Sequence, residues 1–153
     1  MEGIIKHLSF TKRDIPLPAD YRSLYKIGHI LMILSLSCRS GKSSMMKLHF
    51  LCWSIKNKKN IGIVSNWINT GFRGDIHIWG VEPTVNRAIA FAIGDNLINN
   101  IGGEYTITER GDSLFKLMKK EKDLFNKEKE FLIWLGKNTI TEQKVKELAS
   151  KFQ

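Results

Sequence analysis

The chain has 153 residues, of which 42% are hydrophobic and 25% charged, and its formal net charge is +9. This composition is typical of a globular protein and excludes a wholly disordered chain. No apolar run reaches the roughly 18 residues of a membrane span, and the first residues lack the layout of a signal peptide. Because Cys38 and Cys52 have neither metal-ligand spacing nor a disulfide framework, we expect two buried thiols in a cytoplasmic protein.

The positive charge is concentrated in the first half of the chain. Residues 1–83 carry twelve Lys and Arg against five Asp and Glu, whereas residues 84–153 carry twelve against ten. Such an excess attracts phosphate backbones or an acidic protein partner. A solvated lysine-rich surface gives the same composition, so charge alone does not choose between these interpretations.

The chain is predicted to begin with an extended lead-in over residues 1–20, because Pro16 and Pro18 disfavour a helix there. Residues 21–37 then repeat apolar side chains at helical spacing over much of the helix girth. A helix of this kind is typical of the centre of a core.

Two further helices and a strand are predicted in the next fifty residues. Ser43 or Ser44 can cap a second helix over residues 45–57, and a third, shorter helix covers residues 61–70. Residues 75–81 alternate weakly and predict a strand.

Residues 84–118 predict a helix, a tight turn, a strand and a second helix. Thr84 is the expected N-cap, Gly102-Gly103 marks the turn, and residues 104–108 alternate as a strand does. This pattern resembles the wing and following helix of winged-helix domains. Further along, residues 139–142 have the spacing of a capping box and predict a last amphipathic helix.

We therefore expect an α+β fold, mainly helical, with two winged-helix-like units that share a core. After the lead-in at 1–20, a helix-turn-helix-like unit covers residues 21–83. A winged-helix-like unit with C-terminal helices covers residues 84–153.

The segment from Leu36 to Ser43 has part of the pattern of a phosphate-binding P-loop. It includes Gly41-Lys42-Ser43, but Leu36 stands where the first glycine is required. A leucine there obstructs the close approach of the backbone to a phosphate. A nucleotide-binding protein is therefore the third choice, and a turn between two helices is the preferred interpretation.

The remaining chemistry-bearing residues predict neither an enzyme nor a metal or cofactor site. The sequence has no nucleophile-elbow motif. Its histidines are scattered without ligand spacing, at His7, His29, His49 and His77.

Two sets of residues are candidates for binding. Basic side chains at predicted helix ends and turns are where helix-turn-helix domains contact phosphates. Of the four tryptophans most are expected in the core, and those left exposed would anchor a partner. The tentative DNA-binding residues are Arg39, Lys42, Lys47, Lys56, Lys58, Lys59 and Arg73, and the tentative partner anchors are Trp53, Trp67 and Trp79.

Three segments, residues 25–49, 84–98 and 105–115, resemble the small middle components of three-component ABC-ATPase systems, the Lamassu-type bacterial defence operons. The resemblance implies a non-catalytic, winged-helix-like accessory subunit in antiviral defence. Its partners would be an SMC-like ABC ATPase and an effector subunit, with no membrane and no small-molecule substrate, and direct contact with double-stranded DNA is left open. The alternative is a free-standing winged-helix DNA-binding transcriptional regulator.

Overall fold

The computed structural model describes residues 19–76 and 80–151, and it describes side chains from Leu24 onward. Almost all of the predicted lead-in, as well as Trp79, therefore lies outside the described residues. The elements in chain order are α2 (Ala19–Leu36), the 3-10 helix η1 (Arg39–Gly41), β1 (Lys42–Ser44), α3 (Met45–Ser54), α4 (Lys58–Asn69), α5 (Pro83–Gly94), β2 (Ile98–Ile101), β3 (Glu104–Ile107), α6 (Glu109–Lys120), α7 (Asn126–Leu135) and α8 (Glu142–Ser150). The expected α+β class with mainly helical content is confirmed.

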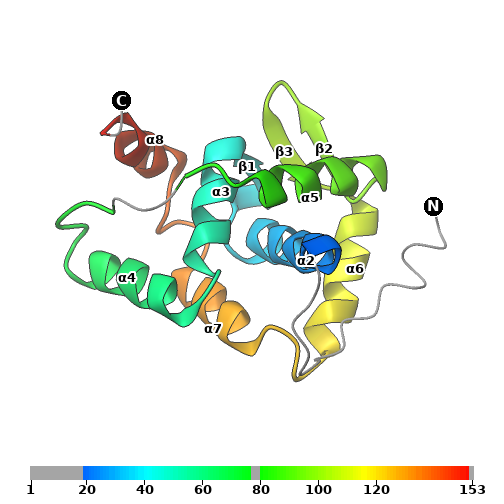
Figure 1. Ribbon diagram of the computed structural model, residues 1–153, viewed down its shortest axis with the longest axis horizontal. Helices are drawn as coiled ribbons and strands as arrows, with labels where there is room; N and C mark the ends of the chain where they lie inside the picture. Colours follow the sequence, from blue (N-terminus) through cyan, green and yellow to red (C-terminus); the bar gives the residue numbers. More distant parts are fainter. Residues whose placement is uncertain (1–18, 77–79, 152–153) are drawn as a thin grey trace.

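The helix α2 forms the centre of the molecule. Five consecutive side chains, residues 30–34, are completely buried, so α2 is enclosed around its whole girth as its apolar sequence predicts. Figure 1 shows α2 surrounded by the helices that contact it, α3, α5, α6 and α7. Within the described ranges, no helix combines the length and the apolarity needed to cross a membrane.

A small antiparallel sheet joins the two halves of the chain. Its strand order is β1-β3-β2, and Ser43 on β1 lies opposite Tyr105 on β3. The strand predicted over residues 104–108 is confirmed as β3, whereas the described residues of 75–81 form no strand. Because β1 belongs to residues 21–83 and β3 to residues 84–153, the sheet and the hydrophobic core draw on both predicted units.

The strand β2 was not predicted, because the helical pattern was extended through it. The helix α5 ends at Gly94, and Asn96 turns the chain with a left-handed φ of 59°. Ile98 then enters the core as the first residue of β2, fully buried. Near this point Gly111 of α6 lies so close that an added Cβ would stand 2.2 Å from the carbonyl oxygen of Leu97. The hairpin of β2 and β3 is thus held against α6.

Side-chain caps fix most helix starts. The predicted cap at Ser44 is confirmed, since its side chain accepts a hydrogen bond from the backbone N–H of Lys47. The predicted cap at Thr84 is wrong: α5 begins at Pro83, whose fixed φ suits the first helical position.

The predicted capping box over residues 139–142 is also wrong. The helix α8 is capped two residues later by Thr141, which accepts from the backbone N–H of Lys144. Glu142 instead accepts from the backbone N–H of Ser44 at 3.1 Å and from its hydroxyl at 2.5 Å. This carboxylate ties α8 to the start of α3.

Candidate functional site

The predicted DNA-binding residues do not form one surface. Arg39 and Lys42 lie just before α3, while Lys56, Lys58 and Lys59 lie just after it. The ten residues of α3 separate these groups by about 15 Å, at the rise of 1.5 Å per helical residue. Arg73 follows α4, whose twelve residues make a helix about 18 Å long.

Several of these cations have partners, and one is buried. Arg39 donates from Nε to Oδ1 of Asn138 at 2.6 Å. Lys42 lies 3.9 Å from Glu104, and Lys56 lies 3.4 Å from Glu82. The prediction that Lys47 contacts DNA is wrong, because only 4% of its surface is exposed. The reason is that α3 is buried on every side from Lys47 to Ser54.

Lys58, Lys59 and Arg73 are exposed. Among the residues for which side chains are described, no Asp or Glu oxygen lies within 4.0 Å of their charged nitrogens. Their charges are therefore available to an anionic partner.

Two of the three tryptophans proposed as partner anchors, Trp53 and Trp67, belong to the core. Trp53 is 5% exposed and Trp67 is 8% exposed, and both rings pack against Phe50. The indole N–H of Trp67 donates to the carbonyl oxygen of Gly74. Their assignment as exposed anchors is wrong. Trp134 on α7 is instead 51% exposed, and the spacing of its buried neighbours on α7 could have identified it from the sequence.

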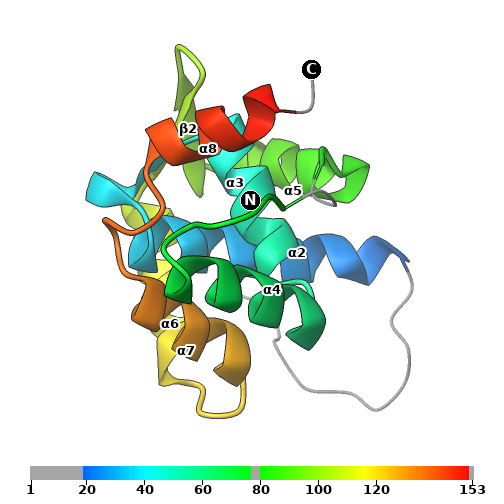
Figure 2. The ribbon, with the colours of Figure 1, turned by 90° about the vertical axis from the view of Figure 1, so that its left-hand side faces the viewer.

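Trp134 lines a groove between α4 and α7. These two helices lie close together in Figure 2. The two helices run in the same direction, with α4 above α7 in this view. The groove has a volume of about 400 Å³. It is called the α4–α7 groove below and is lined by Lys58, Ile61 and Ser65 of α4 and by Lys127, Glu130, Phe131 and Trp134 of α7.

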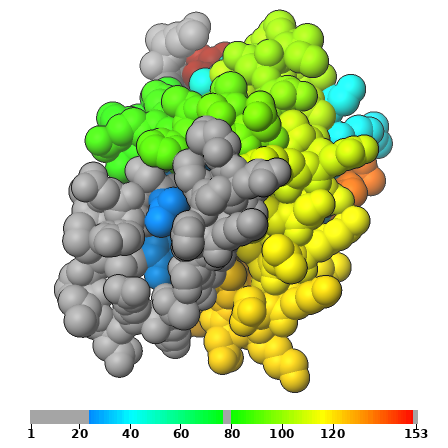
Figure 3. All heavy atoms as spheres, turned by 90° about the vertical axis from the view of Figure 1, so that its right-hand side faces the viewer, coloured from blue at the N-terminus to red at the C-terminus, as the bar shows by residue number. Residues whose placement is uncertain are grey.

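A second exposed surface with apolar side chains is formed by α5 and the hairpin, which lie together on the side shown in Figure 3. Phe91 is 57% exposed and Ile101 is 73% exposed. Arg87 is the single Lys or Arg among the described residues of α5, β2 and the turn to β3. We call this surface the α5–hairpin face; its members are Arg87, Ala90, Phe91, Gly94 and Ile101, all exposed.

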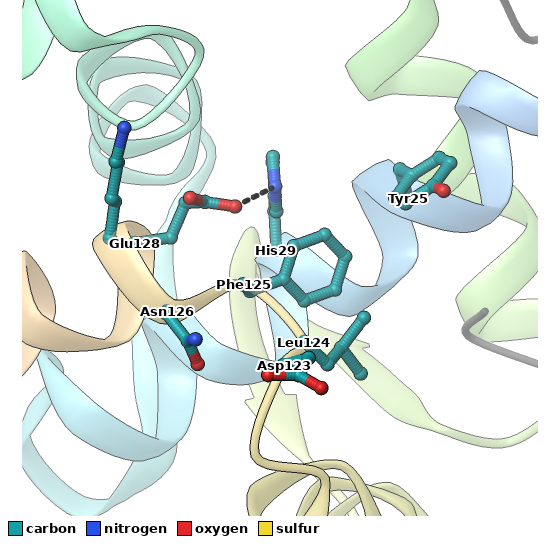
Figure 4. A pocket seen from close by; sticks show the side chains of 8 residues that line it. Tyr25, His29, Asp123, Leu124, Phe125, Asn126 and Glu128 are labelled. Atoms are coloured by element: carbon teal, nitrogen blue, oxygen red, sulfur yellow. Dashed lines mark ion pairs between the residues drawn. The ribbon is translucent and has the colours of Figure 1, made fainter. Parts of the chain in front are cut away.

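A pocket of about 510 Å³ lies where the chain from α6 enters α7, against α2 (Figure 4). There His29 of α2 and Glu128 of α7 point toward each other, with Nε2 and Oε2 3.6 Å apart. The ring of Phe125 stands edge-on to the imidazole, with 4.9 Å between the centroids. Burial lowers the pKa of His29, and the nearby carboxylate of Glu128 offsets only part of this effect.

The pKa of Glu128 has two opposing influences. Burial acts to raise it, but the hydrogen bond and charge of His29 outweigh burial, so the pKa lies below its usual value. His29 is therefore neutral near pH 7, and its buried Nδ1 has no hydrogen-bond partner among the residues whose side chains are described. We interpret the pair as a structural contact between α2 and α7.

The two cysteine thiols of the described chain are part of its packed interior. Both thiols are buried as expected, and burial raises the pKa to about 11 for Cys38 and to about 12 for Cys52. Such thiols are unreactive at neutral pH. Within residues 24–76 and 80–151, no group of three His, Cys, Asp or Glu side chains is arranged to hold a metal ion.

No protein-family description, no curated protein and no solved structure matches this chain. The proposals below therefore start from the α5–hairpin face and the α4–α7 groove.

Proposed function

We propose that this chain is a non-catalytic adaptor subunit that joins an SMC-like ABC ATPase to an effector subunit of an antiviral defence system. The observation that carries this proposal is the composition of the α5–hairpin face. The partners' identities come from the sequence resemblance, and the surface supports the adaptor role.

The order of the elements supports a winged-helix-like unit. Along the chain, α2 is followed by β1, α3, α5 and the β2–β3 hairpin, with α4 between α3 and α5. In the sheet, β3 is the middle strand. In this interpretation there is one such unit, α5 takes the position of the recognition helix, and α4 is an additional helix. The helices α6 to α8 then complete the core around it.

The exposed side chains of α5 favour a protein partner over DNA. A recognition helix reads base edges with Arg, Lys, Asn or Gln and is held by cations on the phosphates. The α5–hairpin face offers Arg87 alone among these cations, together with the apolar Phe91 and Ile101. Exposed aromatic and aliphatic groups of this kind are typical of a protein interface.

The proposal is tested by co-expressing the tagged chain with an SMC-like ABC ATPase and an effector subunit of the proposed complex, taken from the same source as the chain. We expect both to co-purify, and we expect Phe91→Glu to reduce recovery of the ATPase by tenfold or more. Failure of the ATPase to co-purify with the unaltered chain would contradict the proposal.

The alternative, a free-standing DNA-binding regulator, is favoured by the net charge of +9. A salt titration of duplex DNA binding separates the two functions, since the slope of log K against log salt is about −0.9 per phosphate neutralised. A regulator gives a steep slope that depends on Arg87, whereas an adaptor that contacts no DNA gives no binding.

A further inference from the structure

We propose that the α4–α7 groove binds an acidic amphipathic helix of a partner protein. This inference deepens the proposed adaptor function, on which it depends for the identity of the partner, by naming the kind of segment that the partner presents. It uses a different surface from the α5–hairpin face.

The shape of the groove suits a helix. Lys58, Ile61 and Ser65 follow one another at helical spacing along α4, and the lining residues of α7 do the same. Because the two helices run side by side in the same direction, the groove between them is elongated (Figure 2). The ten residues of α7 give it a length of about 15 Å, which matches about ten residues of a docked helix.

One end of the groove is apolar and aromatic. Trp134 is half exposed, and its ring lies 6.0 Å from that of Phe131, which is 5% exposed and forms part of the core. Ile61 of α4, one turn after Lys58, lines the middle of the groove and is partly buried. An aromatic side chain that is fixed on one face and open on the other is the usual anchor of a protein interface.

The other end of the groove is cationic. Lys58 is the first residue of α4, and Lys127 is the second residue of α7, so both lie where their helices begin. The first turns of both helices add to the positive potential. Glu130 is the single acid among the lining residues. This charge favours Asp or Glu on the docked helix at the end opposite Trp134.

The charge also selects among occupants. A second copy of this chain carries the same net charge of +9 and is repelled. A nucleic acid pairs with Lys58 but leaves Ile61 without an apolar partner. An acidic helix with aliphatic or aromatic side chains on one face satisfies both ends.

The test uses a fluorescein-labelled synthetic helix with Glu over its first turn and Leu or Phe at positions i, i+4 and i+7 of the remainder. Binding to the full chain is followed by fluorescence anisotropy. A second peptide in which each Glu is replaced by Lys is the control for the probe. We expect the acidic peptide to bind and the Lys peptide to bind at least about tenfold more weakly, since like charges oppose docking.

Matched variants of the protein locate the site. Trp134→Ala and Lys58→Glu should each weaken binding about fivefold to tenfold, as loss of an interface anchor does. Ile133→Ala removes an apolar side chain that is 60% exposed on the same helix but does not line the groove. Lys59→Glu makes the same charge change as Lys58→Glu at a neighbouring position outside the groove. Both controls should keep the affinity within about twofold of that of the unaltered chain.

The inference is overturned if the acidic peptide does not bind, if Trp134→Ala binds it normally, or if Lys59→Glu weakens it as much as Lys58→Glu. The last result would indicate general attraction to a positive protein. If the unaltered chain co-purifies with the ATPase but does not bind the acidic peptide, this inference fails and the adaptor function stands. Peptide binding without any associated ATPase contradicts the adaptor function and leaves the groove standing.

Discussion

The α5–hairpin face and the α4–α7 groove expose aromatic side chains to a similar degree but differ in charge. Phe91 is 57% exposed on the first surface, and Trp134 is 51% exposed on the second. The first surface contains one cation, whereas the second has Lys58 and Lys127 at one end. Buried apolar area supplies much of the drive for association, while charge selects the partner and its orientation. The two proposed recognition surfaces therefore differ in the charge of the partner that each favours.

The arrangement of the fold keeps these surfaces apart. In Figure 1 α5 and the hairpin lie in the upper right of the molecule, and α4 and α7 lie in the lower left. The central helices α2 and α3 stand between them. The proposed adaptor function would use this separation to bind two partners at once.

The largest expected effect comes from removing the core support of the groove. Trp67→Ala should reduce the free energy of unfolding by about 3–5 kcal/mol, because it empties a large site beneath α4. Trp134→Ala, its matched control on the groove edge, should change the free energy of unfolding by about 0.5 kcal/mol or less. Urea denaturation of both variants measures the difference, and equal losses would show that Trp134 belongs to the core.

The next effect concerns the support of the α5–hairpin face. Gly111→Ala places a Cβ 2.2 Å from the carbonyl oxygen of Leu97 and should cost about 1–3 kcal/mol through overpacking. Gly62→Ala on α4 is the control, since no atom lies within 4 Å of its added Cβ. It should stabilise the helix by about 0.5–1 kcal/mol. Thermal unfolding of the two variants gives the comparison, which fails if Gly111→Ala is as stable as the unaltered protein.

The next smaller effect is on the free energy of association with the ATPase, when an apolar side chain of the α5–hairpin face is replaced. Phe91→Glu should weaken association with the ATPase by tenfold or more, about 1.4 kcal/mol, without lowering the unfolding temperature. Leu117→Glu on α6 alters a side chain of the same 57% exposure outside the face. Quantitative pull-down should show loss for the first variant alone, and equal losses would remove the special role of α5.

The smallest effect is the pH dependence of the contact between α2 and α7. Because the pKa of His29 lies below 6.5 in the folded chain, unfolding takes up protons as the pH falls through 6.5. Stability should therefore be constant above pH 6.5 and decline below it. The lowered pKa of Glu128 acts in the same direction below pH 4.5.

Unfolding temperatures measured between pH 8 and pH 5 test this dependence. His29→Gln should flatten the decline between pH 6.5 and pH 5, because the variant has no imidazole to titrate. A decline of the same steepness in both proteins would show that groups other than His29 cause the pH dependence.

Local patterns predicted local structure well. The continuous apolar helix α2, the cap at Ser44 and the alternation of β3 all follow from neighbouring residues. The pairing of β1 with β3 could not be predicted in this way, because Lys42 and Thr106 are brought together only by the folded core. The end of α5 was missed because Asn96 reverses the chain where the apolar spacing still continues.

The candidate site was predicted less well, for a related reason. Helical spacing shows which residues share a face, but it does not show whether that face meets solvent or another helix. Lys47 and Trp53 lie on α3, which is enclosed on all sides, so neither is available to a partner. The groove is formed by α4 and α7, which are far apart in the sequence, so it depends on tertiary packing.

The most direct test of the two-surface adaptor is a crossed binding measurement on the full chain. The ATPase and the acidic peptide are each titrated against the unaltered protein, Phe91→Glu and Trp134→Ala. The account predicts that Phe91→Glu loses the ATPase and keeps the peptide, whereas Trp134→Ala loses the peptide. Loss of the peptide with Phe91→Glu, or normal ATPase binding by that variant, would contradict the separation of the two surfaces.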